Sequence, residues 1–307
     1  MSHKKVVFMG TPEFSVPILE AIVKSSYKVA CVYTQASKKS NRGQKLNTSP
    51  VFKCAENLKL TLRNPKHLNS TEEFEFFKKL NPDIVVVVAY GQLIAKKFLD
   101  IPKEGFINIH ASLLPKWRGA APIQRSIMNL DTTTGISIMK IIENLDAGPV
   151  MKRIEAKIDE SITADDLSKN LSKISSDSIV EILDDIFNKN LKFSEQNHKL
   201  ATYAKKINKI EAKINWNEGV KKILAKINGL NPNPGAWFVY KDTRYKIWRA
   251  KIIEKSGPPG TILNDNFLIC CGDKSLEITE IQKEGKNKLL LKDFLMGTKF
   301  KQGDELK

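Results

Sequence analysis

The sequence predicts an α/β protein in which a doubly wound, mostly parallel sheet is followed by a smaller C-terminal β-barrel. The first evidence is the order strand, turn, helix, strand near the N-terminus, where Gly10-Thr11-Pro12 closes a buried strand at residues 5–9. The second is an aliphatic run at residues 84–88, which is typical of a strand buried on both faces of a parallel sheet. The third is a change after about residue 200 to short strand-like runs between turn residues, which favours a small barrel.

The other elements follow from hydrophobic periodicity and from residues that end helices. Asn81-Pro82 ends one helix, and Thr163 with Asp166 resembles a capping box that opens another. The polar residues 188–198 are typical of a linker. We expect helices at residues 14–22, 71–80, 121–129, 163–186 and 217–228. We expect further strands at residues 29–33, 106–110, 135–142, 236–240, 245–253, 261–263, 267–271 and 275–281.

Composition limits the class of protein. A chain of 307 residues with 41% hydrophobic residues is long enough for two domains, each with its own core. Its longest apolar run, residues 84–90, is far shorter than the roughly 20 residues that cross a membrane. Gly10 and Pro12 interrupt the first apolar segment before it reaches signal-peptide length, and the four cysteines lack C-x-x-C spacing. We therefore expect a cytoplasmic protein in a reducing compartment, with no membrane association.

Charge and cofactor signals point to a polyanionic partner. The net charge of +16 predicts a surface that attracts such a partner, although the lysines are also compatible with ordinary solvated faces. No metal is expected, because none of the four histidines has paired-ligand spacing. Gly10-Thr11-Pro12 lacks the second and third glycines of a dinucleotide fingerprint, so we expect no nicotinamide cofactor.

Three polar residues form the candidate site. Asn108 and His110 are two positions apart on the predicted strand at residues 106–110, so their side chains project from the same face. Asp146 follows the strand at residues 135–142, and functional groups of open α/β sheets gather at the carboxyl ends of strands, so we expect it near His110. The amide can donate to an oxyanion, the imidazole can move a proton, and the carboxylate can orient the imidazole and favour its charged form.

Ordinary structural roles compete with this interpretation. A single histidine at a strand end is commonly a structural residue, and an Asp-Ala-Gly-Pro segment is a common turn. The chain has no G-x-S-x-G nucleophile motif, and no cysteine lies in a glycine-rich turn or beside an evident base. If the site is catalytic, the attacking group should therefore belong to a substrate.

Longer motifs resolve much of this ambiguity. They are Asn108-Ile109-His110-Ala111-Ser112-Leu113-Leu114-Pro115, Asp146-Ala147-Gly148-Pro149, Gly10-Thr11-Pro12-Glu13-Phe14, Arg42-Gly43-Gln44-Lys45-Leu46 and Trp117-Arg118-Gly119-Ala120-Ala121-Pro122. With these motifs, the chain resembles the formyltransferase family that uses 10-formyltetrahydrofolate. The resemblance runs through nearly the whole chain and is weaker after about residue 200. Within the family, the chain most resembles the members that act on methionyl initiator tRNA.

The resemblance implies a function and a division of the chain. It implies transfer of the formyl group of 10-formyltetrahydrofolate to the α-amine of methionyl initiator tRNA, for translation initiation, with no metal. Asn108, His110 and Asp146 would be catalytic. Residues 1–188 would form a Rossmann-like catalytic domain, 189–206 a linker, and 207–307 an OB-like, tRNA-binding β-barrel. We expect the protein to act as a monomer.

The resemblance also implies binding residues. Ser112, Leu113, Leu114 and Pro115 would lie along the folate, and Leu93 with Ile94 would help to line the pteridine pocket. Arg42 and Lys45 would contact tRNA from a mobile loop at residues 34–46. Without the family, this segment reads as an ordinary solvated loop, and the leucines as core.

Two other functions remain open from the sequence. One is a formyltransferase that acts on a small amine such as an amino sugar nucleotide, because a similar catalytic domain can carry a barrel-like second domain there. The other is a non-enzymatic RNA-binding protein, in which the barrel binds RNA and the α/β half is a scaffold. Aromatic and cationic residues alternate in the barrel sequence at residues 237–251, as they do in many RNA-binding surfaces.

Overall fold

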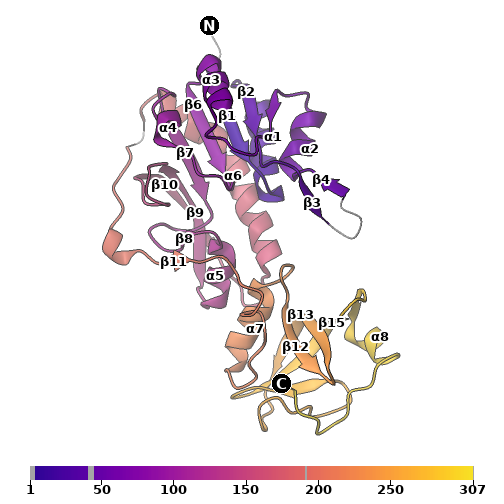
Figure 1. Ribbon diagram of the computed structural model, residues 1–307. Helices are drawn as coiled ribbons and strands as arrows, with labels where there is room; N and C mark the ends of the chain where they lie inside the picture. Colours follow the sequence, from indigo (N-terminus) through magenta and orange to yellow (C-terminus); the bar gives the residue numbers. More distant parts are fainter. Residues whose placement is uncertain (1–3, 41–44, 191, 307) are drawn as a thin grey trace. The chain divides into compact units, whose positions relative to one another are not determined.

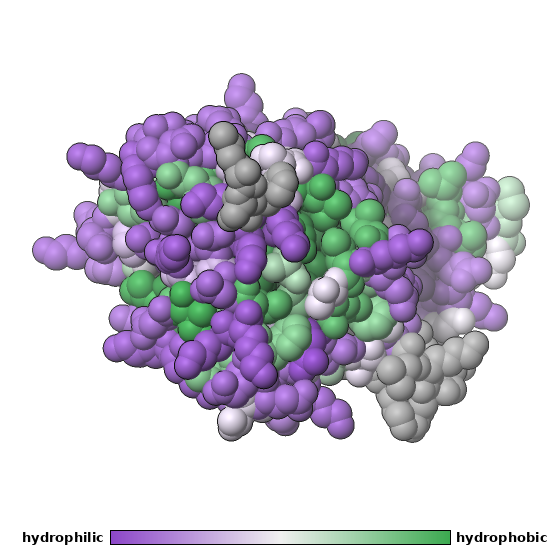
Figure 2. Space-filling view, turned by 90° about the horizontal axis from the view of Figure 1, so that it is seen from above, coloured by the Kyte–Doolittle hydropathy of each residue, from purple (hydrophilic) through white to green (hydrophobic). Residues whose placement is uncertain are grey.

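The computed structural model describes residues 4–40, 45–190 and 192–306, which divide into two compact units (Figure 1). Unit 1 comprises Met1–Gly119, Thr134–Ala156 and Ser168–Tyr203, and unit 2 comprises Ala120–Thr133, Lys157–Leu167 and Ala204–Lys307. The second unit thus includes two short pieces that precede Ser168 in the chain. The surface face in Figure 2 is mostly hydrophilic, with hydrophobic side chains gathered in patches between the polar ones.

Unit 1 is built on a seven-stranded sheet in the order β10–β9–β7–β6–β1–β2–β5. Its strands are β1 (Lys5–Gly10), β2 (Lys28–Tyr33), β5 (Leu62–Arg63), β6 (Ile84–Val88), β7 (Phe106–His110), β9 (Thr133–Lys140) and β10 (Val150–Lys157). The five strands from β7 to β5 pair in parallel, whereas β9 pairs with β7 antiparallel. The predicted doubly wound, mostly parallel sheet is therefore confirmed.

The sheet of unit 1 is buried on both faces. All five residues of β6 are buried, because side chains that alternate along a strand here meet packed helices on both sides. Val7 and Val85 share one core cluster with Phe77 of α3 and Phe98 of α4. On the other side, Ser172 Oγ of α6 donates to the Phe14 carbonyl oxygen of η1.

The helices predicted at residues 14–22, 71–80 and 163–186 are present, whereas the helices at residues 50–57 and 96–99 were not predicted. The helical elements are η1 (Glu13–Ser15), α1 (Val16–Lys24), α2 (Pro50–Asn57), α3 (Thr71–Leu80), α4 (Lys96–Leu99), α6 (Ala164–Phe187), which begins in unit 2, and η2 (His198–Leu200). The predicted capping box is present, since Thr163 Oγ1 and the Asp166 amide are 3.2 Å apart and Thr163 Oγ1 also donates to the Asp166 carboxylate.

The segment at residues 34–46 differs from the loop that the sequence predicts. Strands β3 (Lys38–Ser40) and β4 (Lys45–Asn47) pair antiparallel, with Lys39 opposite Leu46. Residues 34–37 form a loop as expected, whereas the expectation of a loop is wrong for residues 38–40 and 45–46, which form strands. The polar composition of the segment hides the pairing, because the hydrogen bonds of a hairpin are made by the backbone and require no apolar side chain.

Unit 2 contains a curled, antiparallel half-barrel sheet in the order β12–β13–β15–β14, with β16 paired to β15. Its elements are β12 (Ala236–Tyr240), β13 (Thr243–Ile253), β14 (Leu268–Cys270), β15 (Ser275–Lys283), β16 (Lys288–Leu290), α5 (Pro122–Met128), α7 (Val220–Gly229) and α8 (Leu291–Leu295). Two short strands outside the main sheets are β8 (Arg118–Gly119) and β11 (Tyr203–Ala204). The predicted strand at residues 261–263 consists only of isolated bridges, and β16 and α8 were not predicted.

Alternation along β12 separates core from surface. Phe238 and Tyr240 lie in the core cluster of unit 2, whereas Trp237 and Val239 are half-buried, as the sequence pattern predicts. Tyr245 and Trp248 of β13 are also buried, with 4% and 8% of their surface exposed. These aromatic side chains build the core, so they are not available to stack on RNA bases. Among the described residues, no helix is long and apolar enough to cross a membrane.

Candidate active site

His110 is the last residue of β7, and its ring is held at one nitrogen. The Nε2 atom lies 2.9 Å from the carbonyl oxygen of Trp117. A carbonyl oxygen only accepts hydrogen bonds, so Nε2 carries the proton and the neutral ring keeps its lone pair on Nδ1. The side chain is only 7% exposed, which fixes the ring and limits contact with water. Nδ1 is therefore the atom that can accept a proton.

Asp146 faces that same nitrogen. Its Oδ2 lies 3.7 Å from His110 Nδ1 and accepts a 2.8 Å hydrogen bond from the Gly119 amide. The distance is too long for a direct hydrogen bond, but it is within ion-pair range. A proton accepted on Nδ1 would place positive charge beside a carboxylate that is itself oriented by a backbone N–H.

The structure brings Asp146 to His110 by a route that differs from the predicted one. The prediction assumed that strands 106–110 and 135–142 end at the same sheet edge, but β9 runs antiparallel to β7, with His110 opposite Ser137. The end of β9 therefore lies beside the start of β7, so that part of the argument is wrong. Residues 141–149 instead return toward His110. A side chain at Gly148 would lie 2.0 Å from the Lys140 carbonyl oxygen, so only glycine fits there.

Asn108 projects from the same face of β7 as His110, because the two residues are separated by one position. It pairs with Val87 of β6 on one side and with Met139 of β9 on the other. Its side chain is half-buried, and no hydrogen bond joins it to any residue of the described part of the chain. The amide is therefore available to donate to a bound carbonyl or oxyanion.

The segment after β7 is locked by internal hydrogen bonds. Buried Ser112 donates to the Lys116 carbonyl oxygen at 2.6 Å, and its own carbonyl oxygen accepts from Ser137 at 2.7 Å. Leu114 is buried in a small cluster with Met139 and Val150. Of the four residues expected along the folate, Leu113 and Pro115 are half-buried, so these two present the accessible side chains.

Sequence reasoning missed the backbone groups that orient the site. The Trp117 carbonyl oxygen contacts His110, and the Gly119 amide contacts Asp146. Both residues have left-handed backbone angles, with φ of 61° and 116°. The glycine was visible in the sequence as a possible turn, but nothing in a tryptophan signals a positive φ. Gln196, which lies in the segment expected to be a linker, is buried and also contacts the Asp146 backbone.

Each unit of the described chain contains a pocket. One, of about 560 Å³, is lined by Gln35, Lys66, His67, Gly91 and Leu93 among others. Its lining segments follow β2, β5 and β6, so this pocket lies at the carboxyl ends of the parallel strands, the edge at which His110 ends β7. Asn108, His110 and Asp146 are not among its lining residues. Leu93 is 83% exposed, so its side chain is accessible from the pocket.

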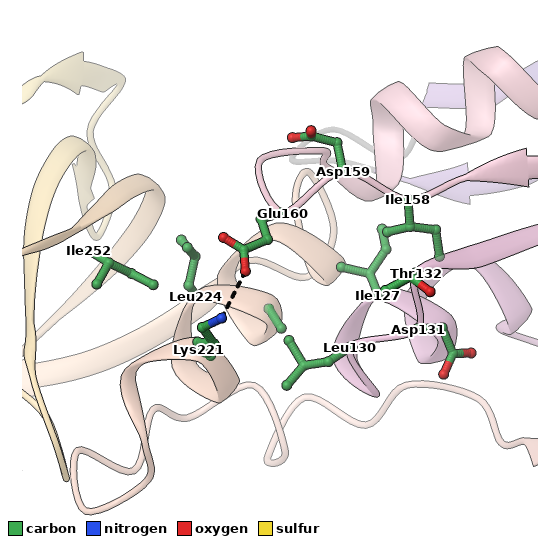
Figure 3. Close-up of a pocket in the computed structure, with 11 residues that line it drawn as sticks. Ile127, Leu130, Asp131, Thr132, Ile158, Asp159, Glu160, Lys221, Leu224 and Ile252 are labelled. Carbon is green, nitrogen blue, oxygen red and sulfur yellow. Dashed lines mark hydrogen bonds and ion pairs between the residues drawn. The ribbon is translucent and has the colours of Figure 1, made fainter.

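The other pocket lies within unit 2 and has a volume of about 290 Å³ (Figure 3). Apolar side chains such as Ile127, Leu224 and Ile252 surround it, and its polar residues are paired: Glu160 bonds Lys221 at 3.1 Å. It contains no histidine or candidate catalytic residue. We therefore place the candidate active site at the edge of β7.

The two residues predicted to contact tRNA are Arg42 and Lys45. Lys45 begins β4 of the β3–β4 hairpin, whereas Arg42 lies outside the described residues. All four cysteines are buried, and burial raises the pKa of both Cys31 and Cys271 to about 12, so neither of these two thiols is a ready nucleophile. Within residues 4–40, 45–190 and 192–306, no group of three or more His, Cys, Asp and Glu side chains could hold a metal ion.

Comparisons with known proteins identify the class of protein to which this fold belongs. Residues 4–183 match the formyl transferase family, and residues 206–299 match the formyl transferase C-terminal domain. The chain therefore belongs to the formyl transferase family, as its motifs predict.

Its relatives are named more specifically. The chain is 50% identical over 305 residues to the methionyl-tRNA formyltransferase of Pelagibacter ubique, covering 99% of this chain and 98% of the relative. It is 42% identical over 302 residues to the enzyme of that name from Jannaschia sp., covering 98% and 99%.

Solved structures share the fold at lower identity. The sugar 3N-formyl transferase WlaRD has a TM-score of 0.69 and 20% identity, covering 94% of this chain and all of that chain. HypX from Aquifex aeolicus in complex with tetrahydrofolic acid has a TM-score of 0.68 and 17% identity, covering 100% of this chain and 51% of that chain. At these identities, the likeness shows the fold alone.

Proposed function

We propose that the protein transfers the formyl group of 10-formyltetrahydrofolate to the α-amine of methionyl initiator tRNA. The observation that carries this proposal is the 50% identity, over nearly the full length of both chains, to a methionyl-tRNA formyltransferase. The cluster of Asn108, His110 and Asp146 supports it, since Asn108 and His110 share one face of β7 and the Asp146 carboxylate, from the loop after β9, faces His110. We further propose that the enzyme works in the cytoplasm, where initiator tRNA is used, and that it acts as a monomer, because the three candidate catalytic residues lie together within unit 1.

The proposed chemistry assigns each side chain a task. A free α-amine has a pKa near 7.7–8.0 and attacks only when it is unprotonated, so the site must accept a proton during the reaction. His110 Nδ1 accepts it, and Asp146 balances the resulting charge. Asn108 donates to the formyl oxygen as the C–N bond to the amine forms. The bond between the formyl carbon and the donor nitrogen then breaks, and the proton returns to that nitrogen.

The pocket beside β6 fits the formyl donor. Its volume of about 560 Å³ is within the range of small-molecule sites, and its lining combines an apolar side chain, Leu93, with the polar groups of Gln35 and Gln92. Lys66 also lines this pocket and would face the carboxylates of a folate tail. Leu113 and Pro115, from the segment that follows His110, would lie along the donor.

The tRNA would be held by cationic residues in both units. We assign Arg42 and Lys45 to the acceptor stem, since Lys45 begins β4 and Arg42 lies between β3 and β4 in the sequence. In unit 2, the half-buried Trp237 is covered by Arg244, whose guanidinium carbon lies 4.3 Å from the ring centroid. This pair is suited to contact phosphates rather than to stack a base.

An assay of product formation tests the proposal. The protein is incubated with methionyl initiator tRNA and 10-formyltetrahydrofolate, and formylmethionine is quantified after the ester is hydrolysed. We expect formylmethionine only when both substrates are present. Absence of product from folded protein that still binds the tRNA would favour the RNA-binding alternative.

A further inference from the structure

Gln196 is a buried side chain whose hydrogen-bonding capacity is fully used. It is 4% exposed, and its Nε2 donates to the carbonyl oxygens of Asp146 at 3.0 Å and Gly148 at 2.7 Å. Its Oε1 accepts from Arg118 Nε at 3.2 Å and Nη2 at 2.7 Å. Two donors and two acceptor positions are all the groups that an amide offers, so the orientation of this side chain is fixed.

Arg118 explains why an amide is needed at this position. The residue is 3% exposed, and its partners are the neutral Gln196 and Nδ1 of His198, which lies 3.0 Å from Nη2. Among the described residues, no ion pair joins Arg118 to a carboxylate. Arg118 offers only donors and therefore turns the amide oxygen toward itself, which leaves Nε2 to face the Asp146 and Gly148 carbonyl oxygens.

Asp146 has an uncommon backbone conformation. Its φ is 48°, in the left-handed region that few residues other than glycine, asparagine and aspartate adopt. Gln196 donates a hydrogen bond to the Asp146 carbonyl oxygen, and the Gly119 amide donates one to its carboxylate. Arg118 and Gly119 are neighbours in the chain. Gly119 therefore holds the Asp146 carboxylate directly, and Arg118 holds the Asp146 carbonyl oxygen through Gln196.

We infer that Gln196, oriented by Arg118, is a positioning residue that keeps the Asp146 carboxylate directed at His110 during formyl transfer. This inference rests on the proposed function. Gln196 does not touch the reacting atoms and acts through the backbone of Asp146. Because misplacement of a catalytic group by about 1 Å can cost roughly 100-fold in rate, its loss should reduce turnover with little effect on tRNA binding.

Gln196→Glu separates positioning from folding. The new carboxylate still accepts from Arg118, which keeps the buried cation paired, but it cannot donate to the Asp146 and Gly148 carbonyl oxygens. We expect kcat to fall about 100-fold while KM for tRNA stays within twofold. Glu195→Gln is the matched control, because it makes the reverse exchange at the adjacent, exposed position and should retain wild-type turnover.

A second substitution at Gln196 and a double mutant test whether the loss of kcat comes from positioning of Asp146. If Gln196→Glu does not fold, Gln196→Met keeps a similar volume without any hydrogen bond and should show the same fall in kcat. In the Asp146→Asn background, Gln196→Glu should cost less than threefold, because both changes remove the same contribution. The inference would be overturned if the loss of kcat in the double mutant equalled the product of the two single losses. A folded Gln196 variant with kcat within twofold of wild type would also overturn it.

Amide exchange provides a readout that does not depend on turnover. The Gly119 N–H is protected by the Asp146 carboxylate, so Gln196→Glu should raise its exchange rate by about tenfold, whereas Glu195→Gln should not. Unchanged exchange at Gly119 would count against positioning. If wild-type protein made no formylmethionine, the proposed function would fail, and the exchange experiment would still decide the role of Gln196.

Discussion

Asp146 Oδ2 lies 3.7 Å from Nδ1 of His110, on the side of the ring opposite the nitrogen that contacts the Trp117 carbonyl oxygen. The contact with the Trp117 carbonyl oxygen keeps a proton on Nε2, and the lone pair of the neutral ring is therefore on Nδ1, which faces Asp146. A base with one nitrogen already committed has a single position at which to accept a proton. A proton taken up by His110 is therefore placed on Nδ1, beside the Asp146 carboxylate.

Asp146→Asn should reduce kcat by at least about 100-fold, the usual contribution of positioned acid–base groups. The amide can still accept from the Gly119 N–H, so the loop should keep its shape, but the negative charge beside Nδ1 is gone. Single-turnover formylation at saturating tRNA measures the loss, and filter binding measures tRNA affinity, which should stay within twofold. Normal turnover would remove Asp146 from the mechanism.

Asn108→Ala should lower kcat about 10²–10³-fold, as expected when one donor to an oxyanion is removed. The half-buried side chain makes no hydrogen bond within the described part of the chain, so folding should be little affected. Steady-state kinetics with both substrates varied measure the change. Asn188→Ala, which removes an exposed amide just beyond α6, is the control. A variant as active as this control would show that Asn108 does not act on the formyl oxygen.

Arg42→Ala and Lys45→Ala should each weaken productive use of tRNA and reduce its salt dependence. Each phosphate contact that is lost should make the slope of log affinity against log salt shallower by about 1. Titration of tRNA binding between low and physiological salt measures that slope. Lys79→Ala removes an exposed lysine of α3 and should leave the slope unchanged. Equal slopes in all three variants would assign the hairpin cations to an ordinary solvated surface.

Acid should weaken unit 2 partly through Glu211. Burial alone would raise the pKa of Glu211, but hydrogen bonds from Arg125 and the Asn208 amide hold it below its usual value. A lowered pKa in the folded state means that the stabilisation is present above about pH 4.5 and is lost as the pH falls through the folded pKa.

Glu211→Gln should therefore reduce the free energy of unfolding by about 1–2 kcal/mol at pH 7, with a smaller difference below pH 4.5. Urea unfolding followed by tryptophan fluorescence measures it, because unit 2 contains Trp216, Trp237 and Trp248. Glu254→Gln breaks an exposed ion pair with Lys274 and should cost much less. The same loss at pH 7 and pH 4 would contradict the assignment to the Glu211 carboxylate.

Most of the fold could be predicted from the sequence because local signals and burial agree. The valine run at residues 84–88 and the helix between Ser70 and Asn81 occur where expected, since a buried central strand and a capped amphipathic helix have strong patterns. Strand direction was less accessible. The residues of β9 do not encode whether it runs parallel or antiparallel to β7, so the predicted path to Asp146 was wrong.

The positions of Asn108 and His110 could also be predicted from a local pattern. The spacing of Asn108 and His110 places both on one face of a strand, which follows from the two-residue period. The contribution of Gln196 could not be seen, because its partners lie 78 and 50 positions away in the chain. A buried glutamine in a polar segment is indistinguishable from a solvated one until the fold brings Arg118 beside it.

The proposed substrate is tested most directly by competition between two amines. Methionyl initiator tRNA and an amino sugar nucleotide are supplied together with limiting 10-formyltetrahydrofolate, and both formylated products are quantified. We predict that formylmethionyl-tRNA is the dominant product and that Asp146→Asn abolishes its formation. Preferential formylation of the sugar amine by the wild-type enzyme would contradict the proposed function.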